Sequence, residues 1–367
     1  MKKKQTDIAI KNMQGNRSSG SDFFNILESK LVLSDGVSFK GFVPDYQENG
    51  IIGEVVFNTG MTGYTESLTD PSYSGQILVF TYPMIGNYGI DTSTMESDKI
   101  QVRGVVVSTL EQDWCHDKST MSLSAWLKEQ NIPVIFGVDT RALTKHLRTR
   151  GTMIGSIGKS KTDLSKVISE TNFVTIEKPI QYPSNGPKKV ILVDCGSKEN
   201  IVRSLLELPI SLKRVPHTYD FCDEDYDGIF ISNGPGNPED YVQAIANIKT
   251  ALGSNKTVFG ICLGSQLLAL ASGAKTYKMQ FGNRGHNQPC IELDTGKCYI
   301  TSQNHGFAVD EKTLGRDWKV IFRNLNDNSV EGVAHRTKPF YAVQFHPEAC
   351  PGPTDTAFLF ERFYKSL

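Results

Sequence analysis

One of the seven cysteines in this sequence is placed where it could act as a nucleophile. Cys262 lies within the run F-G-I-C-L-G at residues 259–264, where an apolar stretch leads into a helix-forming sequence. Glycines two positions before and two after the cysteine permit a sharp strand-to-helix turn, which would lift the thiol out of a sheet. The adjoining helix N-terminus favours the thiolate, so the pattern predicts a nucleophile, although most free cysteines are buried and structural.

A histidine and a glutamate near the C-terminus could supply the other groups that such a nucleophile needs. His346 and Glu348 follow the apolar run Tyr341–Phe345, which places them at the carboxyl end of an expected strand. A histidine base would take the thiol proton and return it to a leaving amine, and the glutamate would hold the imidazole in the required tautomer. By itself, an H-x-E pattern also fits a surface histidine near a turn, so the prediction depends on its occurrence together with Cys262.

A third motif, N-G-P-G at residues 233–236, follows the apolar run Ile229–Ser232. Two glycines around a proline expose backbone N–H groups at a strand end, and such a loop can supply an oxyanion-hole donor. Without the other two motifs, it fits an ordinary tight turn equally well.

The elements that would position these motifs follow an α/β pattern. The second half of the chain has four apolar runs, at residues 190–193, 229–232, 258–261 and 341–345, with helical segments such as 200–208 and 241–252 between them. This alternation predicts an open, mostly parallel α/β sheet covered on both faces, with the chemistry beyond the carboxyl ends of its strands. The first half has short β-rich runs and a helix at 122–130, so we expect a mixed, β-rich α/β domain there.

Composition shifts along the chain predict the domain organisation. We expect a disordered basic tail over 1–25, a first domain over 26–178, a proline-rich linker over 179–189 and a second domain over 190–367. A net charge of −1 gives no electrostatic reason to expect nucleic acid or an anionic membrane as a partner. No apolar run approaches the roughly 18–20 residues of a membrane span. An odd number of cysteines without a C-x-x-C pair predicts neither a disulfide framework nor a metal site, and free thiols fit the cytoplasm.

Together, the N-G-P-G loop, the G-x-C-x-G turn and the final H-P-E resemble the class I glutamine amidotransferases, from about residue 190 to the end. The resemblance implies that Cys262 attacks the side-chain amide of L-glutamine, that His346 is the base and acid, and that Glu348 orients it. A thioester would form, ammonia would leave and water would release glutamate. The backbones of Leu263 and Gly236 would form the oxyanion hole.

The first half narrows the resemblance. Residues 53–89 contain G-E-V-V-F-N-T-G-M-T-G-Y-T-E-S and T-Y-P-M-I-G-N-Y-G, which look like the N-terminal domain of carbamoyl-phosphate synthetase small subunits. The stretches D-T-R-A-L-T at 139–144, S-Q-N-H-G-F at 302–307 and E-A-C-P-G-P at 348–353 are similar to that family as well. By this resemblance the following residues bind L-glutamine: Ser72, Gly234, Gly236, Leu263, Gln266, Asn304, Gly306 and Phe307.

Two positions depart from the family pattern. Ser265 stands where the family usually has histidine, and Cys195 stands where it usually has phenylalanine. Neither belongs to the expected triad, so the departures bear on rate and regulation more than on activity.

The same resemblance implies a partner. The small subunit would pass ammonia to a large carbamoyl-phosphate synthetase subunit, which uses ATP and Mg²⁺ with bicarbonate to make carbamoyl phosphate for arginine and pyrimidine biosynthesis. No cofactor is expected in this chain, which has no G-x-x-x-x-G-K-[ST] phosphate loop. The sequence does not decide whether the heterodimer assembles into higher oligomers. It also leaves two alternative functions to be tested: a free-standing glutaminase or different amidotransferase, and a non-catalytic docking or regulatory subunit.

Overall fold

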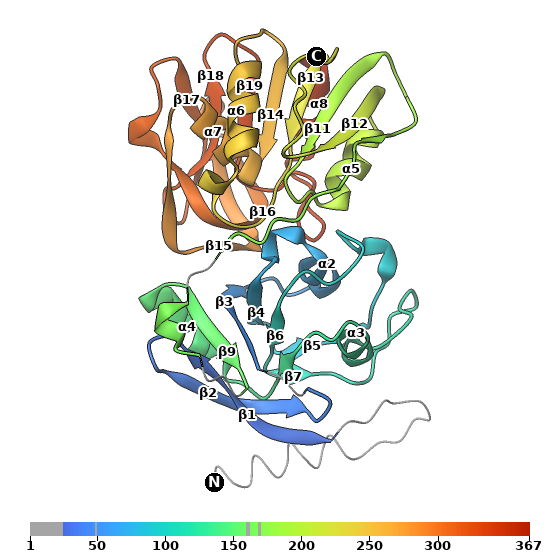
Figure 1. Cartoon of the computed structure of the whole chain (residues 1–367), viewed down its shortest axis with the longest axis vertical. Helices are drawn as coiled ribbons and strands as arrows, with labels where there is room; N and C mark the ends of the chain where they lie inside the picture. The colour runs from blue at the N-terminus through green and yellow to red at the C-terminus, as the bar shows by residue number, and fades with distance from the viewer. Residues whose placement is uncertain (1–24, 48–49, 159–161, 168–169) are drawn as a thin grey trace.

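The computed structural model describes residues 25–47, 50–158, 162–167 and 170–367. Except for its last residue, the expected basic tail over 1–25 lies outside these residues. The chain forms two bodies stacked along the long axis of the molecule, each built on its own large sheet (Figure 1). None of the helices in the described ranges combines the length and apolar character needed to cross a membrane.

The first body is built on a seven-stranded sheet with the order β2-β1-β9-β3-β4-β6-β8. Its strands are β1 (Ile26–Leu33), β2 (Ser38–Pro44), β3 (Ile51–Asn58), β4 (Gln76–Phe80), β6 (Gly104–Val106), β8 (Val134–Ile135) and β9 (Met153–Ile157). A bridge between Phe42 and Phe136 joins the two edges, so the sheet curls toward a barrel. A separate parallel pair consists of β5 (Met84–Ile85) and β7 (Thr109–Leu110).

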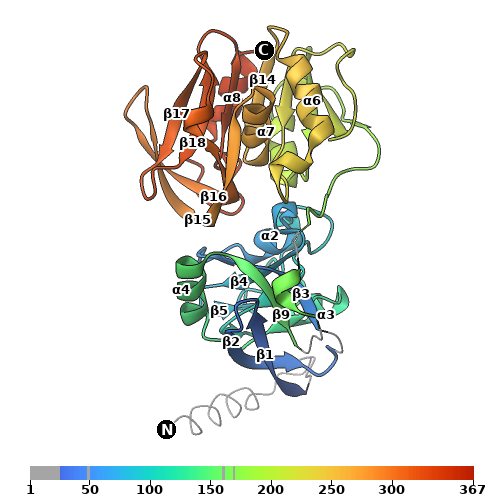
Figure 2. The same ribbon diagram turned by 60° about the vertical axis from the view of Figure 1, so that its left-hand side comes forward.

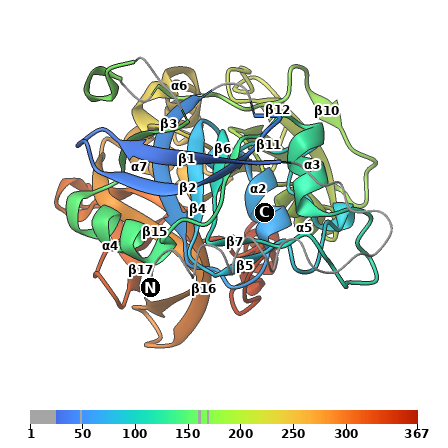
Figure 3. The same ribbon diagram turned by 90° about the horizontal axis from the view of Figure 1, so that it is seen from below.

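Three helices accompany this sheet: α2 (Tyr64–Thr69), α3 (Leu123–Glu129) and α4 (Thr140–Arg150). The last two begin at side-chain caps, since the Ser122 hydroxyl accepts from the Ala125 N–H and the Asp139 carboxylate from the Ala142 N–H. Seen from below, α3 and α4 lie on opposite sides of the strands (Figure 3). The expected β-rich first half, with a helix at 122–130, is confirmed.

The second body is built on a ten-stranded sheet with the order β10-β12-β11-β13-β14-β19-β18-β17-β15-β16. Its strands are β10 (Ile180–Gln181), β11 (Lys188–Asp194), β12 (Ile210–Pro216), β13 (Gly228–Ile231), β14 (Thr257–Ile261), β15 (Lys275–Glu292), β16 (Cys298–Asp310), β17 (Trp318–Asn324), β18 (Val330–His335) and β19 (Phe340–Val343). The central strands β12, β11, β13, β14 and β19 are parallel. The sequence therefore located the parallel centre of the sheet correctly, whereas the strands on either side of it run antiparallel.

Helices cover both faces of the parallel strands, as expected. The helices are α5 (Glu199–Leu206), α6 (Val242–Ala251), α7 (Leu263–Ala271) and α8 (Phe358–Lys365). One core layer contains Ile248 of α6 and Leu267 of α7, and the other contains Ile201 of α5 and Phe363 of α8. With apolar layers on both faces, the parallel strands are rigid supports for the loops at their carboxyl ends.

The two bodies meet along the carboxyl ends of the parallel strands and the long β15–β16 hairpin. Figure 2 shows α2 of the first body at this boundary, beneath the second. Residues 179–189, expected as a linker, contribute β10 and the beginning of β11 to the second sheet. The Tyr182 N–H donates to the Leu212 carbonyl. An extended segment that contains proline can pair in this way at the edge of a sheet.

Candidate active site

Cys262 occupies the single residue between β14 and α7. Its φ of +54° is unusual for a residue with a side chain and marks a strained turn. A Cβ on Gly260 would lie 2.5 Å from the Gly264 carbonyl, and a Cβ on Gly264 would lie 2.3 Å from the Ile231 carbonyl oxygen. Both glycines are therefore required by close packing around the turn.

His346 and Glu348 follow β19, the strand next to β14. The His346 N–H donates to the Ser302 carbonyl at 2.9 Å, which attaches this segment to β16. Nδ1 of His346 lies 2.6 Å from Oε1 of Glu348, and both side chains are buried. Nε2 has no hydrogen-bond partner among the described residues. It is therefore the nitrogen left to exchange a proton with the thiol.

The charges around His346 favour its protonated form. Burial lowers its pKa, but the negative charge of Glu348 and the interaction with Cys262 outweigh burial and raise the pKa to about 10. Burial raises the pKa of Glu348, but Lys198 and His346 outweigh it and lower the pKa to about 2. A thiol proton accepted by this imidazole would leave an ion pair between the thiolate and imidazolium, next to an ionised carboxylate.

Lys198 was missed by the sequence reasoning. It lies just beyond β11, and its Nζ is 3.1 Å from Oε1 of Glu348 and also donates to the Ala349 carbonyl. Its side chain is only 4% exposed, so the ammonium depends on these partners. The position after a parallel strand could have identified it, because side chains beyond these strand ends gather at one edge of the sheet.

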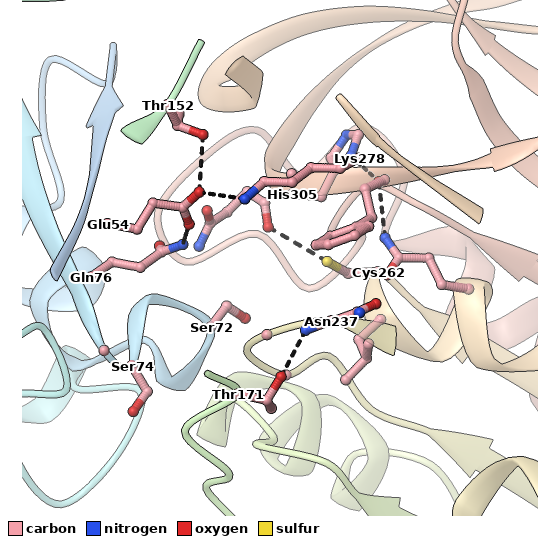
Figure 4. A pocket seen from close by; sticks show the side chains of 18 of the residues that line it. Glu54, Ser72, Ser74, Gln76, Thr152, Thr171, Asn237, Cys262, Lys278 and His305 are labelled. Atoms are coloured by element: carbon pink, nitrogen blue, oxygen red, sulfur yellow. Dashed lines mark hydrogen bonds and ion pairs between the residues drawn. The ribbon is translucent and has the colours of Figure 1, made fainter. Parts of the chain in front are cut away.

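Cys262 opens into a pocket between the two bodies, with Ser72 and Glu54 of the first body on one side and Cys262 on the other (Figure 4). All the residues expected to bind glutamine line this pocket: Ser72, Gly234, Gly236, Leu263, Gln266, Asn304, Gly306 and Phe307. The pocket is open to solvent at its mouth, and the cavity volume is about 100 Å³. His346 and Glu348 do not line it and lie behind Cys262.

Several of these side chains are held by bonds that cross between the bodies. The Ser72 hydroxyl accepts from Nδ2 of Asn233 at 2.8 Å. Nδ2 of Asn304 donates to Oδ2 of Asp70 at 3.0 Å, while the Asn304 carbonyl accepts from the Cys262 thiol at 3.5 Å. Asp70 and the Asn233 side chain were not predicted from the sequence, since their partners are more than 150 positions away.

Gln266 and Leu263 extend from the first turn of α7. Nε2 of Gln266 donates to the Phe307 carbonyl and to Oε1 of Gln344, so its own Oε1 remains to accept a bond from a ligand. As the first residue of the helix, Leu263 has no intrahelical acceptor for its N–H. Gly236, with a φ of +82°, lies in the loop after β13 and faces the same pocket.

Ser265, the departure from the family pattern, is buried in α7 and does not line the pocket. Cys195 is also buried, beside the N-G-P-G loop, and its N–H donates to the Ser232 hydroxyl. Within the part of the chain that the structure describes, there is no group of three or more His, Cys, Asp and Glu side chains suited to a metal ion.

Comparison with known families divides the chain as the structure does. The model described as carbamoyl-phosphate synthase small chain, CPSase domain, matches residues 31–157. The model described as glutamine amidotransferase class-I matches residues 191–366.

Curated relatives cover nearly the whole chain. Multifunctional protein CAD of Squalus acanthias is 48% identical over 351 residues, which is 91% of this chain and 16% of that protein. Carbamoyl-phosphate synthase [ammonia], mitochondrial, of Rattus norvegicus is 44% identical over 92% of this chain and 23% of its own length. Carbamoyl phosphate synthase arginine-specific small chain of Candida albicans is 44% identical over 364 residues, 92% of this chain and 84% of that protein. This chain therefore spans less than a quarter of the first two relatives and most of the third.

Proposed function

Because the chain belongs to the family of carbamoyl-phosphate synthase small chains, we propose that it hydrolyses L-glutamine and delivers ammonia to a carbamoyl-phosphate synthase large subunit. Family membership by itself does not decide the nitrogen source, since the relative from Rattus norvegicus is named for ammonia. The observation that supports hydrolysis here is the arrangement of Cys262, His346 and Glu348. A strained cysteine opens into the pocket, and behind it a buried imidazole has Nδ1 bonded to Glu348 and Nε2 without a hydrogen-bond partner among the described residues.

The proposed reaction begins when Nε2 of His346 takes the proton of the Cys262 thiol. The sulfur attacks the side-chain carbonyl carbon of glutamine, and the N–H groups of Leu263 and Gly236 stabilise the oxyanion. His346 returns the proton to the amide nitrogen, the C–N bond breaks, and ammonia leaves behind a γ-glutamyl thioester. Water then attacks the thioester with His346 as base, which releases glutamate and restores the thiol.

The ammonia is useful only if a partner receives it, because ammonia released into water near neutral pH becomes ammonium. We propose a heteromeric complex with the large subunit, in which ATP and Mg²⁺ act on the partner and this chain needs no cofactor. An interface of this kind buries well over about 1,000 Å². The cytoplasm remains the proposed compartment, since all seven cysteines are unpaired and free thiols fit a reducing environment. Allocation to arginine or pyrimidine synthesis follows from the identity of the partner.

The test is glutamine hydrolysis by the chain co-expressed with its large subunit. Cys262→Ser should abolish hydrolysis and leave ammonia-dependent carbamoyl phosphate synthesis intact. A serine hydroxyl has a much higher pKa than a cysteine thiol, so His346 would not generate an effective nucleophile from it. Cys222→Ser, at a half-buried cysteine whose thiol lies 3.8 Å from the Asn247 carbonyl, is the matched control and should hydrolyse glutamine normally.

The outcomes separate the alternatives. Near-wild-type hydrolysis by Cys262→Ser would contradict the proposed nucleophile. A wild-type complex that uses ammonia and never glutamine would identify a non-catalytic docking subunit. An uncomplexed chain on size-exclusion chromatography, beside an active synthetase, would indicate a free-standing glutaminase.

A further inference from the structure

One buried cation that lines the pocket, Arg284, forms no ion pair with a carboxylate of the residues that the structure describes. Arg284 of β15 is 6% exposed, and its Nη1 donates to the Phe281 carbonyl. Its Nε has no partner, and no carboxylate of the described residues lies within 4.0 Å of its guanidinium. The other buried cations differ, since Lys198 pairs with Glu348 and Arg214 pairs with Asp194 and Glu199.

Glu54, the carboxylate whose charge acts on Arg284, already forms hydrogen bonds with other side chains. Oε1 of Glu54 accepts from Nζ of Lys278 at 2.8 Å and from the Thr152 hydroxyl at 3.0 Å, while Oε2 accepts from Nε2 of Gln76. Burial lowers the pKa of Arg284, and the charge of Glu54 only partly opposes this effect. An isolated guanidinium in such a place is unfavourable unless an anion arrives to pair with it.

The position of Arg284 identifies where that anion would bind. Arg284 lines the same pocket as Cys262. Its Nη2 lies 3.0 Å from the place that a Cβ on Gly306 would occupy, so the guanidinium lies against the backbone of an expected glutamine-binding residue. Nε is enclosed by the protein, whereas Nη2 has no acceptor among the described residues and can donate a charge-assisted hydrogen bond to a carboxylate in the pocket.

We propose that Arg284 binds the α-carboxylate of L-glutamine and thereby selects free α-amino acids as substrates. The inference rests on the proposed glutaminase function. The side-chain amide of glutamine must point toward Cys262 for hydrolysis. The α-carboxylate is the one anionic group of glutamine, so it is the group that can pair with the buried guanidinium of Arg284. A site that holds a carboxylate in this way discriminates against analogues without the charge, because the guanidinium is then left unpaired.

The test compares L-glutamine with L-glutamine α-amide, in which a neutral carboxamide replaces the α-carboxylate. Ammonia release by the wild-type complex should favour L-glutamine strongly. Arg284→Met should lower kcat/KM for L-glutamine by roughly 10- to 100-fold and change that for the α-amide by less than about threefold. Arg284→Lys should retain part of the preference, because it keeps the charge and loses the planar guanidinium.

Arg214→Met is the matched control, because it also removes a buried guanidinium but one whose anions belong to the fold. It should affect both substrates equally. A wild-type complex without preference for L-glutamine would overturn the inference, as would an Arg284→Met variant that loses activity equally on both substrates. A wild-type complex that hydrolyses neither substrate refutes the proposed function. Calorimetric binding of L-glutamine to wild type and Arg284→Lys would still test the role of Arg284, and equal affinities would overturn it.

Discussion

Replacing Glu348 by glutamine would distinguish the roles of its two partners, His346 and Lys198, which both contact the same carboxylate oxygen. Oε1 of Glu348 lies 2.6 Å from Nδ1 of His346 and 3.1 Å from Nζ of Lys198. A glutamine side chain has nearly the same shape and can still accept a hydrogen bond from Nδ1, but it carries no charge. We therefore expect Glu348→Gln to keep the imidazole in position and to remove its electrostatic support.

The stability of the variant should fall because Lys198 keeps its charge and loses its nearest anion. Removing one partner of a buried ion pair destabilises a protein by about 3–5 kcal/mol. The charges of Glu96 and Asp70 also raise the pKa of Lys198, against the effect of burial, so they retain part of the attraction. We expect a loss of about 2–4 kcal/mol in the free energy of unfolding.

Glutamine hydrolysis should fall less than it would after loss of His346. General acid–base catalysis contributes about 10²–10⁴-fold, and the base itself remains in Glu348→Gln. We expect turnover to fall by roughly 10- to 100-fold in that variant and by more in His346→Asn. The assay is glutamate production under saturating glutamine, with each variant in complex with the large subunit.

A double variant separates stability from catalysis. Glu348→Gln with Lys198→Met removes both charges, so urea unfolding should show at least about 1 kcal/mol of recovery relative to Glu348→Gln, while turnover stays low. Additive stability losses in this cycle would show that the two charges do not stabilise each other. Wild-type stability and turnover in Glu348→Gln would refute both roles of the carboxylate.

Three further predictions concern the pH dependence of Glu348, the packing of Gly264 and the role of Ser265. The pKa of Glu348 is lowered from 4.5 to about 2, so its ionised form stabilises the fold above pH 4.5 and this contribution declines as the pH falls toward 2. The difference in urea midpoint between wild type and Glu348→Gln should therefore shrink over that range, and a constant difference would contradict the assignment. Gly264→Ala should lower both thermal stability and turnover, with overpacking of about 1–3 kcal/mol against the Ile231 carbonyl, and an unchanged Tm would exclude that contact. Ser265→His introduces, at a buried position of α7, the residue that the family resemblance leads us to expect there, and we expect it to strengthen the stimulation of hydrolysis by bicarbonate and ATP in the complex. No change in basal or stimulated rate would exclude a role for this position in inter-subunit control.

The local sequence was sufficient to predict the turn at Cys262 and the parallel centre of the second sheet. The turn depends on contiguous residues, since the glycines at 260 and 264 are needed by the same close packing that raises the thiol. The parallel strands are buried on both faces, so each appears in the sequence as a continuous apolar run. The order of these strands then brings Cys262 and His346 to neighbouring strand ends.

The antiparallel strands and the ionic environment of the site were decided by the tertiary structure. β15 is 18 residues long and largely polar, because part of it faces the first body, so it has no apolar period that would reveal it. Lys198 and Glu348 are 150 positions apart, and the bond between Asn304 and Asp70 joins the two bodies. A charged side chain forms an ion pair, or lacks one among the described residues as Arg284 does, according to which distant groups the fold places within a few ångströms of it. Local propensity carries no information about that distance, because Coulombic and hydrogen-bond energies depend on spatial separation and burial.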